Sequence, residues 1–170
     1  MQTNKMGNGE VEKKMKGIVI FDTSYGNTKR IAETIAGTLR ESGVEADLFN
    51  VKDVKSLNAN DYSFLVLGSP TKFGTMSFAI RFFLGKVKGD EWSCRPFAAF
   101  DTENPENMLK KDWSAAEKIA EKLRSKNMNQ LLPALKAAVL GQKGPLQDGE
   151  IERTKEFTRG LASKLKEFTP

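Results

Sequence analysis

Six consecutive residues with hydroxyl, amide or glycine character form the most chemically distinctive segment of this sequence. They follow Asp22 and lead directly into an amphipathic stretch: Thr23, Ser24, Tyr25, Gly26, Asn27 and Thr28. Hydroxyl groups and the free N–H groups of a helix N-terminus together bind anions, and a glycine lets the backbone come close. Helix capping is the alternative interpretation, but a cap needs only one such residue. The segment lacks the GxxxxGK and GxGxxG patterns. It contains no lysine or arginine, so it predicts a phosphomonoester held by neutral donors and the helix dipole.

Two further segments carry candidate binding residues. The second segment follows Gly68 and consists of Ser69, Pro70, Thr71, Lys72, Phe73 and Gly74. A stiff proline, a flexible glycine and a loop aromatic suit contact with a planar ligand, although Phe73 could instead pack under the following helix. The third segment runs over 101–107 and begins with Asp101, Thr102 and Glu103. Its acidic side chains could contact a nucleotide-like ring or simply solvate a turn.

The composition excludes several kinds of chemistry. The 170 residues include no histidine and a single cysteine, Cys94. Ser-His-Asp and Cys-His mechanisms, imidazole metal sites, CxxC redox pairs and cysteine-held clusters are therefore impossible within this chain. No catalytic or metal-ligating residue is assigned, and we expect any demanding chemistry to belong to a bound cofactor. Cys94 is expected to be a buried structural thiol, and Trp92 and Trp113 are expected to be packing residues.

Short apolar runs alternate with amphipathic stretches and predict the elements that must position these segments. The predicted strands are 18–21, 44–48, 64–67, 97–100 and 136–140. The predicted helices are 28–42, 75–86, 112–126 and 148–168. Phe78, Phe82 and Phe83 are expected on the inner side of the second helix.

This alternation predicts an α/β fold with a five-stranded parallel sheet covered by helices on both faces. The second strand alternates apolar and acidic residues, as a half-buried edge strand does, which is consistent with the order 2-1-3-4-5. Ligands of such sheets bind outside the carboxyl ends of the strands, beside the first strand. The segments after Phe21, Leu67 and Phe100 should therefore meet at one edge.

The net charge and the composition of the N-terminal segment indicate which binding partners and which cellular location to expect. The net charge is +5, but the basic residues are scattered, which favours a solvated surface and gives no support to nucleic-acid binding. The sequence has neither the run of about 20 apolar residues needed to span a membrane nor an apolar signal-peptide core, so a cytoplasmic location without membrane association is expected. Residues 1–15 are interpreted as a flexible tail and 16–170 as one domain.

The motifs themselves resemble those of flavodoxins. IVIFDTSYGNTKRIAETIA is similar to their first phosphate loop and helix, whose pattern is S/T-x-T-G-N-T. GSPTKFG resembles their second loop, which contacts the isoalloxazine ring, and GPLQDGEIERTKEF resembles their last helix. The resemblance covers about residues 16–168 and is to the short-chain type. It implies a flavodoxin-like three-layer sandwich.

The resemblance also implies FMN as cofactor. The phosphate would bind residues 23–28, the flavin ring would lie against residues 70–74, and the segment from Phe100 to Asn104 would close the other side. Tyr25 stands where the family usually has threonine, and the tyrosine that usually stacks on the flavin from the third loop is missing. Asp101 and Glu103 are expected to disfavour the anionic reduced flavin, and Lys72 to favour it.

The function implied is a carrier that shuttles low-potential electrons between redox proteins. Because this chain is basic, an acidic, ferredoxin-like partner is expected. An FMN-dependent NAD(P)H:quinone-type reductase remains the alternative, and a binding module that has lost its flavin is a third possibility. Neither the redox partners nor the oligomeric state follows from the sequence.

Overall fold

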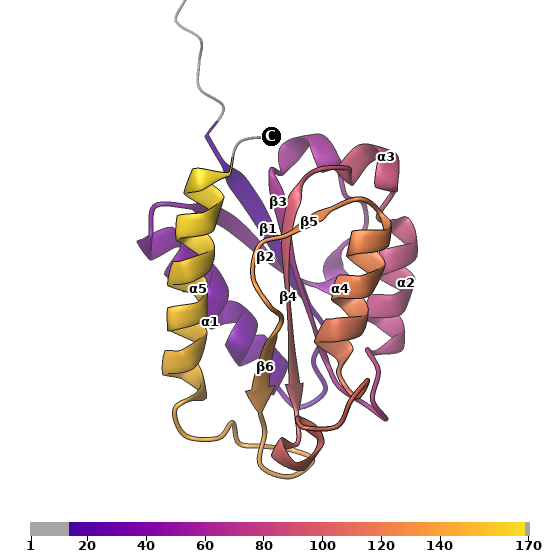
Figure 1. The fold of residues 1–170 in the computed structure, drawn as a ribbon, viewed down its shortest axis with the longest axis vertical. Coiled ribbons are helices and arrows are strands. Elements are labelled where there is room, and N and C mark those ends of the chain that lie inside the picture. The colour runs from indigo at the N-terminus through magenta and orange to yellow at the C-terminus, as the bar shows by residue number, and fades with distance from the viewer. Residues whose placement is uncertain (1–13, 169–170) are drawn as a thin grey trace, which may run out of the picture.

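The computed structural model describes residues 14–168, which are built around one parallel sheet (Figure 1). Its strands are β1 (Lys16–Phe21), β2 (Glu45–Asn50), β3 (Phe64–Pro70), β4 (Pro96–Glu103), β5 (Asn129–Gln130) and β6 (Leu135–Ala138). The order β2-β1-β3-β4-β5 confirms the predicted topology. The last predicted strand, 136–140, corresponds to β6, which pairs with the end of β4, and an additional two-residue strand, β5, pairs with the start of β4. Most of the predicted tail lies outside the described residues.

Helices cover both faces of the sheet and make three layers (Figure 1). The helices are α1 (Asn27–Glu41), α2 (Phe78–Lys86), α3 (Gly89–Trp92), α4 (Ala115–Ser125) and α5 (Glu150–Glu167). Short 3-10 turns occupy η1 (Val51–Asp53), η2 (Ala59–Asp61) and η3 (Pro105–Asn107). Helices α1 and α5 lie on one face, and α2 and α4 lie on the other. Within residues 14–168, no helix combines the length and apolarity needed to cross a membrane.

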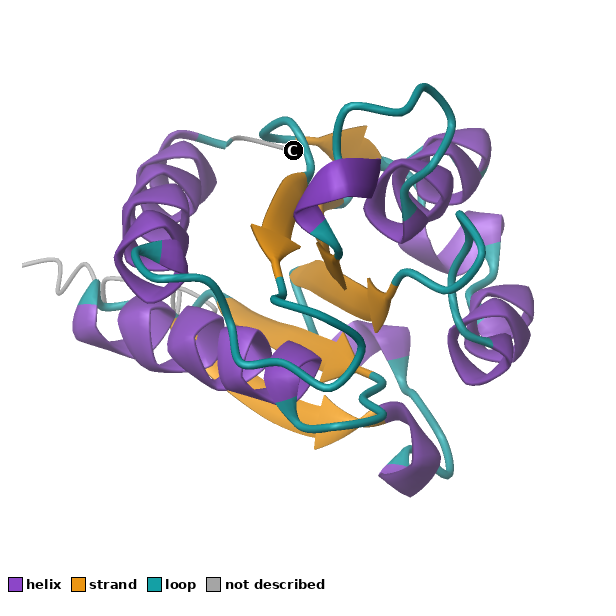
Figure 2. Ribbon diagram, turned by 90° about the horizontal axis from the view of Figure 1, so that it is seen from below, coloured by secondary structure: helices purple, strands orange, loops and turns teal. Residues whose placement is uncertain are grey.

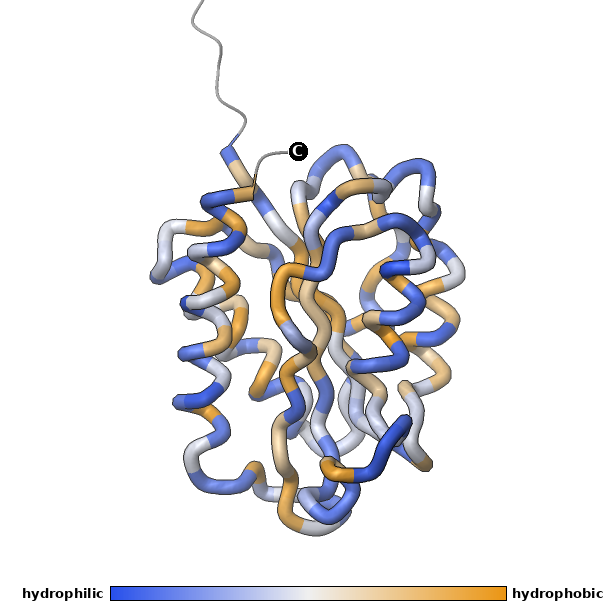
Figure 3. The backbone as a smooth tube through the Cα atoms, viewed as in Figure 1, coloured by the Kyte–Doolittle hydropathy of each residue, from blue (hydrophilic) through white to orange (hydrophobic). Residues whose placement is uncertain are grey.

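Alternation along the central strands divides the core in two. In β1, Ile18 and Ile20 pack toward α2 and α4, whereas Val19 and Phe21 pack toward α1 and α5. Apolar side chains on both faces explain the continuous apolar runs of the sequence, and Figure 3 shows hydrophobic segments along the central strands. In β2, Ala46 is buried and Glu45 is exposed, which confirms the half-buried edge strand.

The buried face of α2 differs from the prediction. Phe83 is buried, but Phe78 and Phe82 are 81% and 62% exposed. Ser77 caps the helix by accepting a hydrogen bond from the Ile80 N–H at 3.3 Å, so the helix begins at Phe78. The inward positions then include Ile80 and Phe83, three residues apart, and the other two phenylalanines point to solvent.

Two further expectations were wrong. Cys94 is exposed: it lies in the turn between α3 and β4, outside both elements, and takes a left-handed conformation (φ 65°). Trp113 is not in a helix, because Ser114 caps α4 and accepts a hydrogen bond from the Glu117 N–H at 3.2 Å. In addition, β4 continues through Glu103, so the start of the predicted third loop is strand.

Candidate functional site

A cavity of about 380 Å³ opens where the carboxyl ends of the strands meet. Figure 2 shows the loops that gather at this edge of the sheet. The lining residues are Thr23, Ser24, Tyr25, Asn27, Thr28, Pro70, Thr71, Lys72, Phe73, Thr102, Glu103, Asn104, Asn107, Trp113, Val139, Gly141 and Gln142. The volume lies within the range of about 300–1,000 Å³ typical of cofactor sites. The three predicted segments therefore meet in one place.

The first segment forms a turn that leaves the N-terminus of α1 without a side-chain cap. The Asp22 carboxylate accepts a hydrogen bond from the Thr23 N–H at 2.9 Å, and the Thr23 hydroxyl accepts one from the Gly26 N–H at 2.9 Å. Gly26 takes a left-handed conformation (φ 90°) immediately before the helix. Serines cap α2 and α4, whereas no side chain caps α1 or α5, and each of these two helices follows a left-handed glycine. The capping interpretation is therefore wrong, and the polar side chains and N–H groups suit an anion.

Contacts from other segments fix the first turn of α1. The buried Thr28 Oγ1 lies 2.7 Å from Thr102 Oγ1 and so joins α1 to β4. Asn27 Nδ2 donates a hydrogen bond to the Lys143 carbonyl at 3.1 Å. These contacts link the first segment to β4 and to the loop after β6.

The second segment is a tight turn with an exposed aromatic at its tip. Lys72 and Thr75 exchange backbone hydrogen bonds of 2.9 and 3.0 Å, and Phe73 and Gly74 both have positive φ, 48° and 74°. Phe73 is 93% exposed, so it does not pack under the following helix. Gly74 lies against Trp113, and a Cβ at position 74 would come within 2.8 Å of the indole Cε3. The indole therefore forms part of the cavity wall beside this turn.

Asp101 is a structural carboxyl that joins β4 to α4. Its Oδ2 accepts hydrogen bonds from Ser114 Oγ at 2.6 Å, the Ala116 N–H at 2.9 Å and Thr71 Oγ1 at 3.2 Å. Burial raises the pKa of Asp101, and these hydrogen bonds act in the opposite direction. Asp101 does not line the cavity; it positions the second segment and α4 around it.

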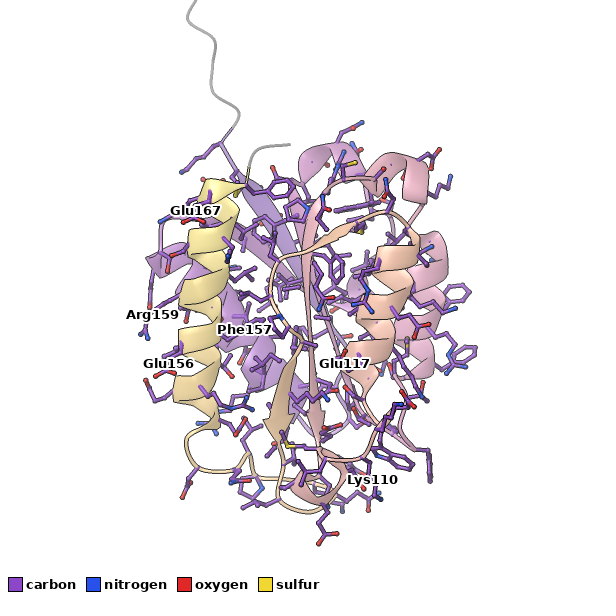
Figure 4. All side chains as sticks on the ribbon, in the orientation of Figure 1. Lys110, Glu117, Glu156, Phe157, Arg159 and Glu167 are labelled. Carbon is purple, nitrogen blue, oxygen red and sulfur yellow. The ribbon has the colours of Figure 1, made fainter. Side chains whose placement is uncertain are left out.

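Glu103 differs from Asp101 because it lines the cavity and its carboxyl is unpaired. It is 3% exposed, and among the described residues neither of its oxygens has a hydrogen-bond partner. Burial and then the charge of Asp101 raise the pKa of Glu103 to about 7, against the opposing effect of Lys136. The nearby Thr71 hydroxyl also opposes this rise, but its hydrogen bond goes to Asp101. Figure 4 shows Glu117 on α4 and Lys110 in the preceding loop.

Five of the predicted site residues do not line the cavity: Gly26, Ser69, Gly74, Phe100 and Asp101. Gly26 and Gly74 shape turns, and the Ser69 hydroxyl accepts a hydrogen bond from the Ser77 N–H at 2.8 Å. Phe100 is fully buried in the core on the α1 and α5 side.

The sequence interpretation missed part of the cavity wall. Asn107 lies in the predicted third segment but beyond the part expected to close the site, and Trp113 was assigned to packing. Val139, Gly141 and Gln142 follow β6, so the rule that locates ligands at carboxyl ends of strands would have identified this loop too.

Comparisons with known proteins agree with the fold. Residues 19–153 match the family model described as flavodoxin. A flavodoxin of Aquifex aeolicus is 37% identical over 78 residues, which cover 45% of this chain and 42% of that protein. A protoporphyrinogen IX dehydrogenase [quinone] of Escherichia coli K12 is 32% identical over 72 residues, 42% of this chain and 40% of that protein. The chain thus spans less than half the length of these curated relatives.

The likeness to solved structures extends over nearly the whole chain. A flavodoxin from the domain Archaea superposes with a TM-score of 0.74 and 26% sequence identity, covering 89% of this chain and 99% of that one. The family match covers far more than half of the sequence and includes the first two cavity segments. This chain therefore belongs to the flavodoxin family.

Proposed function

We propose that the protein binds FMN at the carboxyl edge of its sheet and carries electrons between redox proteins. The observation that carries the proposal is the α1 N-terminus, which has no side-chain cap and lies beside a hydroxyl-rich turn at a cavity of cofactor size. In a flavodoxin-family chain, this arrangement suits a phosphate-bearing flavin. FMN supplies the one- or two-electron chemistry when it is bound, and the protein binds and orients it.

Different walls of the cavity would hold the two ends of the cofactor. Thr23, Ser24 and Thr28 line the end next to α1 and would bind the phosphate together with the backbone N–H groups of its first turn. Phe73 and Trp113 bring aromatic surface to the same cavity and would contact the ring. Trp113 thus offers an aromatic group where the third segment lacks a tyrosine.

The surface next to the cavity suits an acidic redox partner. Phe73 lines the cavity, Phe78 and Phe82 are exposed on α2, and the Lys86 ammonium lies 4.8 Å from the centroid of the Phe82 ring. Lys72 and Arg81 are exposed on the same segments. Aromatic groups surrounded by cations favour an apolar contact with an acidic rim, so the rate of electron transfer should fall as salt is added.

A quinone reductase on the same fold is the second candidate. The likeness to a protoporphyrinogen IX dehydrogenase [quinone] over 72 residues favours it. Oxidation of NAD(P)H or of a reduced porphyrin by the FMN-loaded protein alone, with a quinone as acceptor, would identify an enzyme. Reduction that needs a separate redox protein would identify a carrier.

Titration of the flavin-free protein with FMN and with riboflavin, followed by flavin fluorescence, tests the proposal. The two ligands differ only in the phosphate, so FMN should bind at least about tenfold more tightly. Thr28→Val should reduce that preference, whereas Thr34→Val, six residues further along α1, should leave it unchanged. Equal affinities for FMN and riboflavin would contradict the phosphate site, and no binding of either would contradict the function.

A further inference from the structure

Glu103 is a buried carboxyl whose hydrogen-bonding capacity the protein leaves unused. Both of its oxygens are buried without a partner among residues 14–168, although the side chain lines the cavity. Asp101, two residues earlier on the same face of β4, accepts three hydrogen bonds through one oxygen. A buried polar group without a partner costs about 1–3 kcal/mol, and a ligand in the cavity can satisfy it.

The groups around Glu103 favour its neutral form. Asp101 on β4 and Glu117 on α4 both oppose a negative charge at Glu103. Lys136 on β6 favours the charge, but its ammonium lies 3.8 Å from a Glu117 oxygen and is shared with that carboxylate. From the turn after β3, Lys72 is the charged residue that lines the cavity. Burial and the two carboxylates therefore favour the neutral form of Glu103. The opposing effect of Lys136 is partly offset by its ion pair with Glu117.

We propose that Glu103 binds the flavin as a neutral carboxylic acid, donating its O–H to an acceptor on the ring system, and that ionisation of Glu103 weakens binding. The inference rests on the proposed FMN function. A carboxylic acid carries a donor and an acceptor side by side, which complements the adjacent C=O and N–H groups of a flavin. The anionic phosphate of FMN adds a further charge that opposes ionisation. Binding above neutral pH therefore takes up one proton from solvent.

The proposal predicts a specific pH dependence of affinity. If only the neutral acid binds, the dissociation constant rises about 15-fold between about pH 7 and about pH 8.5 for a group that titrates near 7. Glu103→Gln keeps a donor and an acceptor but cannot ionise, so its dissociation constant should change less than about twofold over this range. Glu106→Gln makes the same chemical change at an exposed position in η3 and should retain the wild-type pH dependence.

The experiment measures FMN dissociation constants by fluorescence for the wild type and both variants across this pH range. The second pKa of a phosphate monoester is about 6, so the phosphate is largely dianionic throughout; riboflavin, which has no phosphate, serves as a second probe. A rise in the wild type that is absent from Glu103→Gln supports the proposal. A flat wild-type profile, or an equal rise in Glu103→Gln, overturns it while leaving FMN binding intact. Failure of the wild type to bind FMN at about pH 7 overturns the proposed function itself and the inference with it.

Discussion

Replacing Glu103 with glutamine should make the flavin-free protein more stable at high pH. Burial and the charge of Asp101 raise the pKa of Glu103 from 4.5 to about 7 in the folded protein. A carboxyl with a raised folded-state pKa contributes stability that is fully present below about pH 4.5 and is lost as pH rises through about 7. Glutamine does not titrate, so the variant does not lose this stability.

The size of this difference in stability follows from the shift in the pKa of Glu103 on folding. At about 1.36 kcal/mol per pKa unit, the wild type loses about 2.5 kcal/mol relative to Glu103→Gln between about pH 5 and about pH 8. Water in the adjoining cavity screens the charge, so we expect a difference between about 1 and about 2.5 kcal/mol. In a domain of this size, the lower value alone moves Tm by about 2–4 °C.

Urea denaturation at a series of pH values measures this difference. The free energies of unfolding of the wild type, Glu103→Gln and the exposed control Glu106→Gln are compared at each pH. The advantage of Glu103→Gln over the wild type should grow from about pH 5 to about pH 7 and level off by about pH 8, whereas Glu106→Gln should follow the wild type. A difference that stays constant with pH, or an advantage that shrinks as pH rises, would refute the assignment of Glu103 as a group destabilised by ionisation.

Three further substitutions test other parts of the structure. Asp101→Ala removes three hydrogen bonds that hold α4 and the second segment, so it should lower the free energy of unfolding by about 3 kcal/mol in urea denaturation; equal losses in Asp101→Ala and Asp101→Asn would argue against the hydrogen bonds. Gly74→Val places a Cβ 2.8 Å from Trp113 at a positive φ, so both Tm and FMN affinity should fall, and an unchanged Tm would be inconsistent with this packing. Lys72→Glu should slow electron transfer with an acidic protein partner several-fold and weaken its salt dependence in stopped-flow measurements; identical rates would remove Lys72 from the docking surface.

The sheet could be predicted because its central strands are buried on both faces. Continuous apolar runs such as Ile18–Phe21 report that burial directly, and the alternation around Ala46 reports an edge. The site position then followed from topology, since loops after parallel strands share one edge. The polar residues after Phe21 were identified for the same reason.

Features set by tertiary contacts were not accessible from the sequence. Asp101 and Glu103 look like loop residues because they are acidic, yet β4 continues through them between β3 and β6. The outward direction of Phe78 depends on where α2 begins, which the Ser77 cap determines. Trp113 enters the cavity wall because α4 starts two residues later. Each of these depends on a particular cap or strand pairing.

Amide NMR spectra of the flavin-free protein during titration with FMN test the central proposal most directly. Saturable, one-to-one shifts should concentrate in residues 23–28, 70–74 and 102–107, at Trp113 and in the loop 139–142, with the largest changes at the first turn of α1. The amides at the opposite end of the sheet, near α3, should not move. Shifts centred elsewhere, or a folded protein whose spectrum FMN leaves unchanged, would contradict an FMN site at the carboxyl edge of this sheet.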